Sequence, residues 1–125
     1  MTVTVKDIAE AKYVLLTTYR GSGRPVASPL WAVRDGDDLL MWTGADSAKV
    51  SRLRRDNRVL VQACDARGRT VSGPQVAGVA VIEPPEHVAG LIARKYGLPG
   101  RIALRTSGLR RRGGGSVALR IRDVV

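Results

Sequence analysis

Short runs of strand-forming residues, separated by turn signals, constrain this chain more than any other feature. Three runs follow one another near the start: Tyr13 to Tyr19 (YVLLTTY), Pro25 to Val33 (PVASPLWAV) and Leu39 to Thr43 (LLMWT). β-Branched and aromatic residues favour strands, and the GSG and DGDD sequences between the runs favour tight turns. The spacing therefore predicts an antiparallel meander of three strands with short loops.

The rest of the chain alternates strands with helices. Three further strands are predicted over Arg58 to Cys64, Pro74 to Glu83 and Ser116 to Ile121. Helices are predicted over Val5 to Lys12, from Asp46 or Ser47 to Asp56, and from Pro85 to Tyr96 with Gly97 as the C-cap. Six strands and three helices predict a mainly β fold, a small closed or partly closed antiparallel β-barrel with helices at its ends. With 125 residues, we expect a single domain spanning 1–125.

A net charge of +10 implies an anionic partner, which is a nucleic acid, an acidic membrane surface or a phosphorylated small molecule. Few aromatic residues (4%) and no recognisable binding motif argue against nucleic acid. No stretch is long enough or apolar enough to span a bilayer, and we expect no membrane partner. The single cysteine, Cys64, and the absence of a signal peptide in Met1 to Ala11 predict a cytoplasmic protein.

Several common chemistries find no support in the sequence. The chain has no CxxC, no HExxH and no cluster of histidine and cysteine, so no metal site is expected. A GxxxxGK[ST] loop is absent, which excludes a P-loop nucleotide site. No set of side chains stands out as a catalytic constellation, and we assign no catalytic residue.

The stretch LLMWTGADSAKVSRLRR carries the strongest functional signal. A strand ends in Trp42 and Thr43, a turn with a glycine follows, and a helix begins with Ser47 and Lys49. A helix N-terminus presents unpaired N–H groups and the positive end of the dipole. A lysine there disfavours the helix, because its positive charge lies at the positive end of the dipole, and a bound anion would offset this repulsion. A second interpretation, with Lys49 in water and Asp46 as an ordinary cap, fits this stretch alone equally well.

Two other strands contain irregularities. Pro29 removes a ladder donor from its run, which predicts an edge strand or a bulge, with Ser28 and Trp31 close by. Gly78 interrupts a β-branched run, which predicts a bulge or a close backbone approach, and a tight barrel corner is the structural alternative. Gln75 offers a donor and an acceptor to a ligand, with a solvated edge as its structural alternative.

Taken in order, the segments GSGRPVASPLW, LLMWTGADSAKVSRLRRDNRVLV, QVAGVAVI and ARKYG resemble the pyridoxamine 5'-phosphate oxidase-like split barrels. The sequence is more similar to their short actinobacterial relatives, the flavin/deazaflavin oxidoreductases that use coenzyme F-420. The resemblance covers roughly Ala11 to Tyr96 and returns at Ser116 to Ile121, and the order and spacing of the segments carry it. It implies a homodimeric split β-barrel in which a second subunit completes the cofactor cleft.

The resemblance also implies a cofactor site. In the family, the segment around Ser28 to Trp31 lies along the ring, the Trp42 strand end and the following helix start hold the ribityl phosphate, and the position of Gln75 contacts the ring. The implied cofactor-binding residues are Ser28, Pro29, Leu30, Trp31, Trp42, Thr43, Ser47, Ala48, Lys49, Arg55 and Gln75.

The sequence departs from the family pattern in two places. The usual Ser-Arg-Lys reads Ser47-Ala48-Lys49 here, which weakens the case for a standard FMN phosphate pocket. The Arg-x-His that binds substrate in true pyridoxamine phosphate oxidases has no counterpart, because the chain's single histidine is His87, and this argues against vitamin B6 oxidation.

The resemblance and the charge together predict a deazaflavin (coenzyme F-420)-dependent oxidoreductase that transfers a hydride between the reduced cofactor and an unknown small organic acceptor. The phosphodiester and poly-glutamate tail of F-420 suit the basic chain, in which Arg52, Arg54, Arg55 and Arg58 flank the expected phosphate site. We also expect the basic Leu98 to Gly115 segment near the cleft. The alternatives are an FMN-binding flavoprotein, a cofactor carrier without turnover and, more remotely, a nucleic-acid-binding module.

Overall fold

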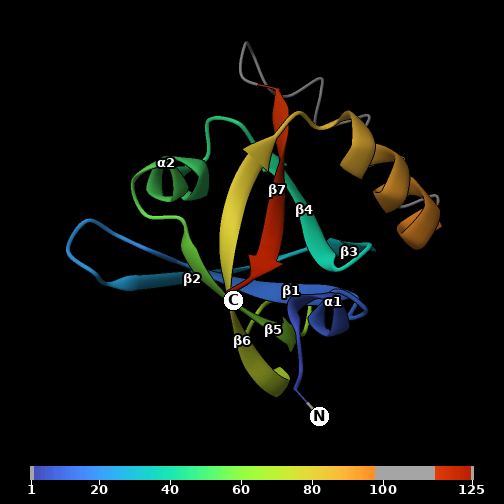
Figure 1. Cartoon of the computed structure of the whole chain (residues 1–125), viewed down its shortest axis with the longest axis horizontal. Coiled ribbons are helices and arrows are strands. Elements are labelled where there is room, and N and C mark those ends of the chain that lie inside the picture. The colour runs from blue at the N-terminus through green and yellow to red at the C-terminus, as the bar shows by residue number, and fades with distance from the viewer. Residues whose placement is uncertain (1, 98–114, 125) are drawn as a thin grey trace.

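The computed structural model describes residues 2–97 and 115–124 (Figure 1). The labelled elements are α1 (Val5–Ile8), β1 (Tyr13–Tyr19), β2 (Pro25–Leu30), β3 (Ala32–Asp35), β4 (Asp38–Gly44), α2 (Ala48–Arg55), β5 (Arg58–Cys64), β6 (Val71–Glu83) and β7 (Ser116–Asp123). A further helix covers residues 86–97. The strands form one antiparallel sheet in the order β2-β1-β5-β6-β7-β4-β3. The predicted mainly β class is confirmed.

The predicted strand from Pro25 to Val33 is wrong in one respect, because the chain breaks it at Trp31. Before the break, Leu30 pairs with Val14 of β1, and after it Ala32 pairs with Met41 of β4. The described sheet therefore has seven strands, not six. Since β2 has β1 as its one neighbour, it is the edge strand that Pro29 predicted.

The sheet is open, so the predicted closed barrel is not formed by hydrogen bonds. Its two edges are β2 and β3, and no ladder joins them in the described structure. These edges are nevertheless consecutive in the chain, because Trp31 alone separates them. A sheet whose first and last strands are covalent neighbours has to coil back on itself, and Figure 1 shows the strongly coiled sheet that results.

Two apolar clusters form on the two faces of this coiled sheet. Along β4, Leu39 and Met41 point into the inner cluster, which α1 and α2 complete with Val5, Ile8, Val50 and Leu53. The alternate residue Leu40 points outward and, with the partly buried Trp42, packs under the helix over residues 86–97. Figure 1 shows that helix and α2 on opposite sides of the sheet. None of the helices in the described part of the chain is long and apolar enough to cross a membrane.

Several element boundaries differ from the sequence prediction. Helix α1 ends at Ile8, not Lys12, and β6 begins at Val71, not Pro74, because β5 and β6 continue to pair beyond a bulge. Strand β7 continues past Ile121, since it still pairs with β6 there. Helix α2 begins after Ser47, which settles the choice of cap residue. Gly97 has a φ of +64°, the left-handed conformation expected of a C-cap glycine.

The backbone of Gly78 lies close to strand β7, which is one of the two possibilities that the sequence predicted. A Cβ atom placed on Gly78 would lie 2.7 Å from Cγ2 of Ile121 and 2.9 Å from the carbonyl oxygen of Arg122. The bulge in β6 lies elsewhere, where the register with β5 shifts between Val61 and Ala63. Gly78 is therefore required by packing against β7, not by a bulge.

Arg120 of β7 joins three acidic side chains across the outer face of the sheet. Its guanidinium lies 2.7 Å from Glu83, 2.9 Å from Asp38 and 3.1 Å from Asp35, and its side chain is 14% exposed. Burial raises the pKa of Asp35, but hydrogen bonds from Arg120 and from His87 outweigh it and leave that pKa below its ordinary value. The cluster ties β3, β4, β6 and β7 together.

We expect Arg120→Met to lower the free energy of unfolding by ~1–2 kcal/mol at pH 7, because three carboxylates would then lack their shared cation. The folded-state pKa of Asp35 is depressed, so its stabilising contribution is present above about pH 4 and is lost as the pH falls through the folded pKa. The difference between the variant and the parent should therefore shrink below about pH 4. Urea unfolding at pH 7 and pH 3 checks this, and an equal difference at both pH values would contradict it.

Candidate functional site

The turn between β4 and α2 forms the first part of the candidate site. Thr43 is buried near the end of β4, where it pairs with Val117 of β7. The N–H of Ala45 donates to the carbonyl of Gly115 at 3.1 Å, and the N–H of Ser47 donates to the carbonyl of Gly44 at 3.1 Å. The start of α2 is therefore held on both sides, against β7 and against its own turn.

The hydroxyl of Ser47 is the most unusual polar group in this turn. Ser47 has the extended conformation of an N-cap residue (φ −69°, ψ 155°), yet its side chain makes no capping hydrogen bond. In residues 2–97 and 115–124 its Oγ is the one buried side-chain polar atom without a hydrogen-bond partner. A buried polar group left unpaired costs about 1–3 kcal/mol. A bound group that accepts this hydrogen bond would recover that cost.

The first turn of α2 favours an anion at the same place. It contains no acidic residue, and the half-buried Lys49 is its second helical position. The N–H groups and dipole of a helix start attract negative charge, and a lysine adds a full positive charge. The predicted Ser47, Ala48 and Lys49 lie at this helix start, and Thr43 lies in the strand that precedes it.

Three arginines gather beside the other end of α2. The Nε of Arg52 donates to the buried hydroxyl of Thr18 at 2.7 Å. Burial lowers the pKa of Arg52, and the nearby positive charges of Arg20 and Arg55 lower it further. The Arg55 guanidinium reaches the β1–β2 turn, where it lies 3.0 Å from the place of a Cβ on Gly21.

These three arginines have no acidic partner in the described part of the chain, unlike Arg58, which lies 2.7 Å from Asp56. A hollow of about 490 Å³ lies between the β1–β2 turn and the end of α2, and Arg20, Arg55 and the Asp56–Arg58 ion pair line it, whereas Arg52 does not. Positive charges held close together without an acid favour an anionic ligand.

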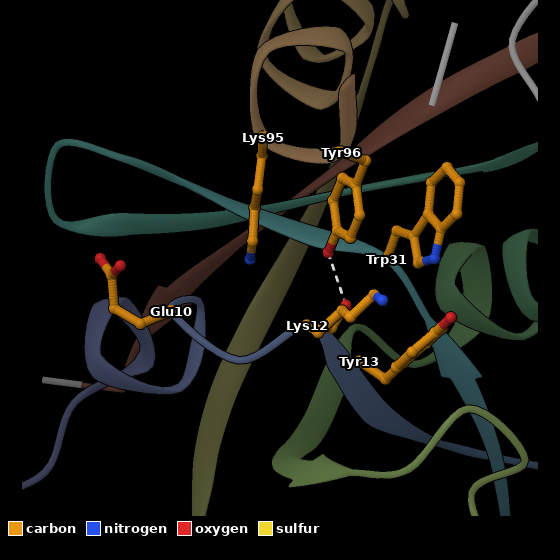
Figure 2. Close-up of a pocket in the computed structure, with 6 residues that line it drawn as sticks. All are labelled: Glu10, Lys12, Tyr13, Trp31, Lys95 and Tyr96. Atoms are coloured by element: carbon orange, nitrogen blue, oxygen red, sulfur yellow. Dashed lines mark hydrogen bonds between the residues drawn. The ribbon is translucent and has the colours of Figure 1, made fainter. Parts of the chain in front are cut away.

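The predicted ring segment, Ser28 to Trp31, ends at the break between β2 and β3. The indole of Trp31 stacks on the ring of Tyr96, with the ring centres 4.4 Å apart and an angle of 9° between the ring planes (Figure 2). Trp31 and Trp42 pack against the same outer cluster. Because Ala32 pairs with Met41, the antiparallel register places Trp31 next to Trp42. The structure therefore brings the end of the ring segment to the strand end that precedes the α2 start.

Gln75 lies far from the other predicted site residues within one chain. It is exposed and lies beside the bulge of β6. The β6 residue nearest to Thr43 across the sheet is Glu83, which lies eight residues further along the strand than Gln75. Eight residues of strand span roughly 26 Å. Gln75 is also three strands from Ser28, roughly 14 Å across the sheet. A single chain does not bring Gln75 to the start of α2.

Two residues that the sequence analysis left without a role fix the neighbourhood of Trp31. The Lys95 ammonium donates to the carbonyls of Ala9, Ala11 and Ala32 at 2.8, 2.6 and 2.6 Å. The Tyr96 hydroxyl donates to the carbonyl of Lys12 at 2.6 Å and accepts from the N–H of Ala32 at 3.1 Å. Burial lowers the pKa of Lys95 and raises that of Tyr96 to about 12.

The sequence contained a partial signal for this pair. The segment ARKYG formed part of the resemblance, and a basic residue in the last turn of a helix often bonds carbonyl groups. The carbonyls that Lys95 contacts lie 63 to 86 residues away in sequence, so local patterns did not reveal them.

One protein-family model matches most of the chain. The family model for pyridoxamine 5'-phosphate oxidase matches residues 2–110. The chain belongs to this family. Proteins of the pyridoxamine 5'-phosphate oxidase family bind flavins or related cofactors. None of the curated proteins matches the chain in sequence.

Solved structures share the fold of this family member. A conserved hypothetical protein of Mycobacterium tuberculosis has a TM-score of 0.68 at 21% identity, over 100% of this chain and 83% of the other. An F-420 reductase has a TM-score of 0.66 at 17% identity, over 100% and 97%. The heme storage protein HutZ of Vibrio cholerae has a TM-score of 0.63 at 14% identity, over 98% of this chain and 92% of the other. At these identities the likeness establishes the fold alone. The basic segment expected near the cleft, 98–114, lies outside the described residues.

Proposed function

We propose that the protein is an oxidoreductase that uses coenzyme F-420 and transfers a hydride to or from a small organic molecule in the cytoplasm. The unpartnered, buried hydroxyl of Ser47 at the start of α2 carries the proposal, because it lacks the hydrogen bond that a phosphodiester oxygen would accept. The cofactor supplies the hydride chemistry when bound. The chain's own residues bind it: Thr43, Ser47 and Lys49 hold the phosphate, and the segment Ser28 to Trp31 lies along the ring.

The arginines at the far end of α2 favour F-420 over FMN. Helix α2 has eight residues and spans about 12 Å, so Arg55 at its end lies well beyond the reach of a phosphate held at its start, and the Nε of Arg52 is bonded to Thr18 instead. A single phosphate would leave Arg20, Arg52 and Arg55 without a negative partner. An acidic tail that runs along α2 would reach them, and arginine pairs well with carboxylates.

We also propose that the protein is a homodimer that shares the site. The outer faces of β5 and β6 present Leu60, Ala77, Val79 and Val81, and no described helix covers them; Val81 is 42% exposed. A second copy would shield this apolar surface. In such a dimer, Gln75 of one subunit could contact a cofactor bound to the other subunit, whereas within a single chain it lies too far from the site.

A Ser47→Ala variant tests the proposed function. We expect its affinity for oxidised F-420 to fall about tenfold, which corresponds to ~1.4 kcal/mol for one lost hydrogen bond to a charged group. The melting temperature of the cofactor-free protein should stay the same or rise, because no capping bond is lost and a buried unpaired hydroxyl disappears. Fluorescence titration and thermal unfolding measure the two effects.

Ser51→Ala is the matched control, because Ser51 is an exposed serine of the same helix. It should bind F-420 like the parent. An unchanged affinity in Ser47→Ala would contradict the proposal, and so would a loss of ~1 kcal/mol in stability, which an ordinary cap serine would cause. Tighter binding of FMN than of F-420 would favour the flavoprotein alternative.

A further inference from the structure

A second hollow lies at the break between β2 and β3, beside Trp31. It measures about 400 Å³ and is lined by Glu10, Lys12, Tyr13, Trp31, Lys95 and Tyr96 (Figure 2). Its walls come from three parts of the chain: the link between α1 and β1, the break at Trp31, and the end of the helix over residues 86–97. None of these residues except Trp31 belongs to the predicted cofactor site.

We propose that this hollow binds a small planar aromatic molecule that carries an anionic group, such as a carboxylate. The proposal concerns a ligand other than the cofactor and does not require the cofactor to be bound. Three features of the hollow support it: rigid aromatic walls, a lysine beside them without an acidic partner, and the position of the acidic side chain in the lining.

The aromatic walls are fixed before any ligand arrives. Tyr96 is held by its hydrogen bonds to Lys12 and Ala32, and Trp31 stacks on it at 4.4 Å. Figure 2 shows Tyr13 on the other side of the hollow, with its hydroxyl directed towards Trp31. Aromatic side chains prefer to pack against other rings, and walls that do not have to be ordered reduce the entropy cost of binding. The hollow therefore suits a flat, unsaturated ring.

The positive charge comes from two lysines. The Lys95 ammonium donates all three of its N–H groups to neutral carbonyls, and the negative charge of Glu10 acts on it through space. The Lys12 ammonium lies 5.8 Å from the ring centre of Tyr13 and has no acidic partner in residues 2–97 and 115–124. Lys12 is exposed, so its ammonium can move to meet an anion beside the aromatic walls.

The acidic residue of the lining does not neutralise Lys12. Figure 2 shows the Glu10 carboxylate beyond Lys95, away from Lys12 and the three rings. It lies 3.8 Å from the Arg34 guanidinium, and its charge also acts on the neighbouring Lys95 ammonium. The aromatic side of the hollow is therefore positive. A neutral aromatic molecule would pack against the aromatic walls but form no ion pair with Lys12. An aliphatic anion would pair with Lys12 but gain little from the aromatic walls.

Calorimetric titration of the full chain, without cofactor, tests the proposal with two probes of the same shape. We expect 2-naphthoate to bind about two- to fivefold more tightly than the uncharged 2-naphthamide, the effect of one partly exposed ion pair. Lys12→Ala should remove this preference, and Lys12→Arg should restore it. Lys6→Ala is the matched control, since Lys6 is another accessible lysine near the N-terminus and pairs with Asp37.

Equal affinities of the two probes for the parent protein would overturn the proposal, as would naphthoate binding that survives Lys12→Ala unchanged, or no binding of either probe at millimolar concentration. The result is independent of the proposed function, because F-420 is absent from these titrations. A chain that binds naphthoate through Lys12 but ignores F-420 would retain this site and lose the proposed cofactor.

Discussion

Lys49→Ala is expected to weaken F-420 binding about 50-fold, or ~2.3 kcal/mol. Lys49 occupies the second position of α2, next to the unpartnered Ser47 hydroxyl, and it is the single basic residue in the first turn. A charged donor to a phosphate contributes more than a neutral one, so the loss should exceed that of Ser47→Ala.

Fluorescence titration of oxidised F-420 measures this effect at two salt concentrations. The parent should lose affinity with added salt more steeply than Lys49→Ala, because the variant has one charge fewer to screen. Lys49→Arg should recover most of the affinity, whereas Lys6→Ala, with its lysine on α1, should bind like the parent. If Lys49→Ala binds F-420 within twofold of the parent, the phosphate does not lie at the start of α2.

Gly78→Val is expected to lower the free energy of unfolding by about 3 kcal/mol, a large fraction of the stability of a typical domain. The new Cβ would lie 2.7 Å from Ile121 and 2.9 Å from the carbonyl of Arg122. A backbone carbonyl cannot rotate away as a side chain can, and Gly78 is buried between β5 and β7. Accommodation would require β6 and β7 to separate, which would break their ladder.

Denaturant unfolding compares this variant with a glycine substitution elsewhere. Gly90 lies in the helix over residues 86–97, and a Cβ on it would meet nothing within 4 Å. Gly90→Ala should therefore stabilise the protein slightly, by ~0.5–1 kcal/mol. A Gly78→Val variant as stable as the parent would mean that β6 and β7 are not packed as closely as described.

The sequence predicted the strands that are uninterrupted runs of strand-forming residues. It did not predict the break at Trp31, which depends on pairing with strands distant in sequence. β1 and β5 match their predicted bounds, because both are uninterrupted strand-forming segments between clear turn signals. PVASPLWAV continues to favour a strand on both sides of Pro29, so no local signal indicates that the run divides at Trp31. The division arises because β1 and β4 lie at different parts of the sheet and each takes one half of the run.

The candidate site was predictable to the same extent. A local capping pattern predicted the helix start at Asp46 or Ser47, and in the structure Ser47 is the N-cap. That the Ser47 hydroxyl caps nothing is a matter of side-chain geometry, which the pattern does not determine. The contact of Arg52 with Thr18 spans 34 residues, and that of Tyr96 with Lys12 spans 84. Such contacts depend on the whole fold.

The prolines of β2 determine how the sheet can grow. Pro25 and Pro29 lie in its outermost strand, where neither can donate a backbone hydrogen bond to an incoming strand. A peptide that tried to extend the sheet along β2 would find two donors missing from a six-residue strand. Aggregation by strand addition is therefore disfavoured on this side, and copies of the chain can associate through the sheet's face instead.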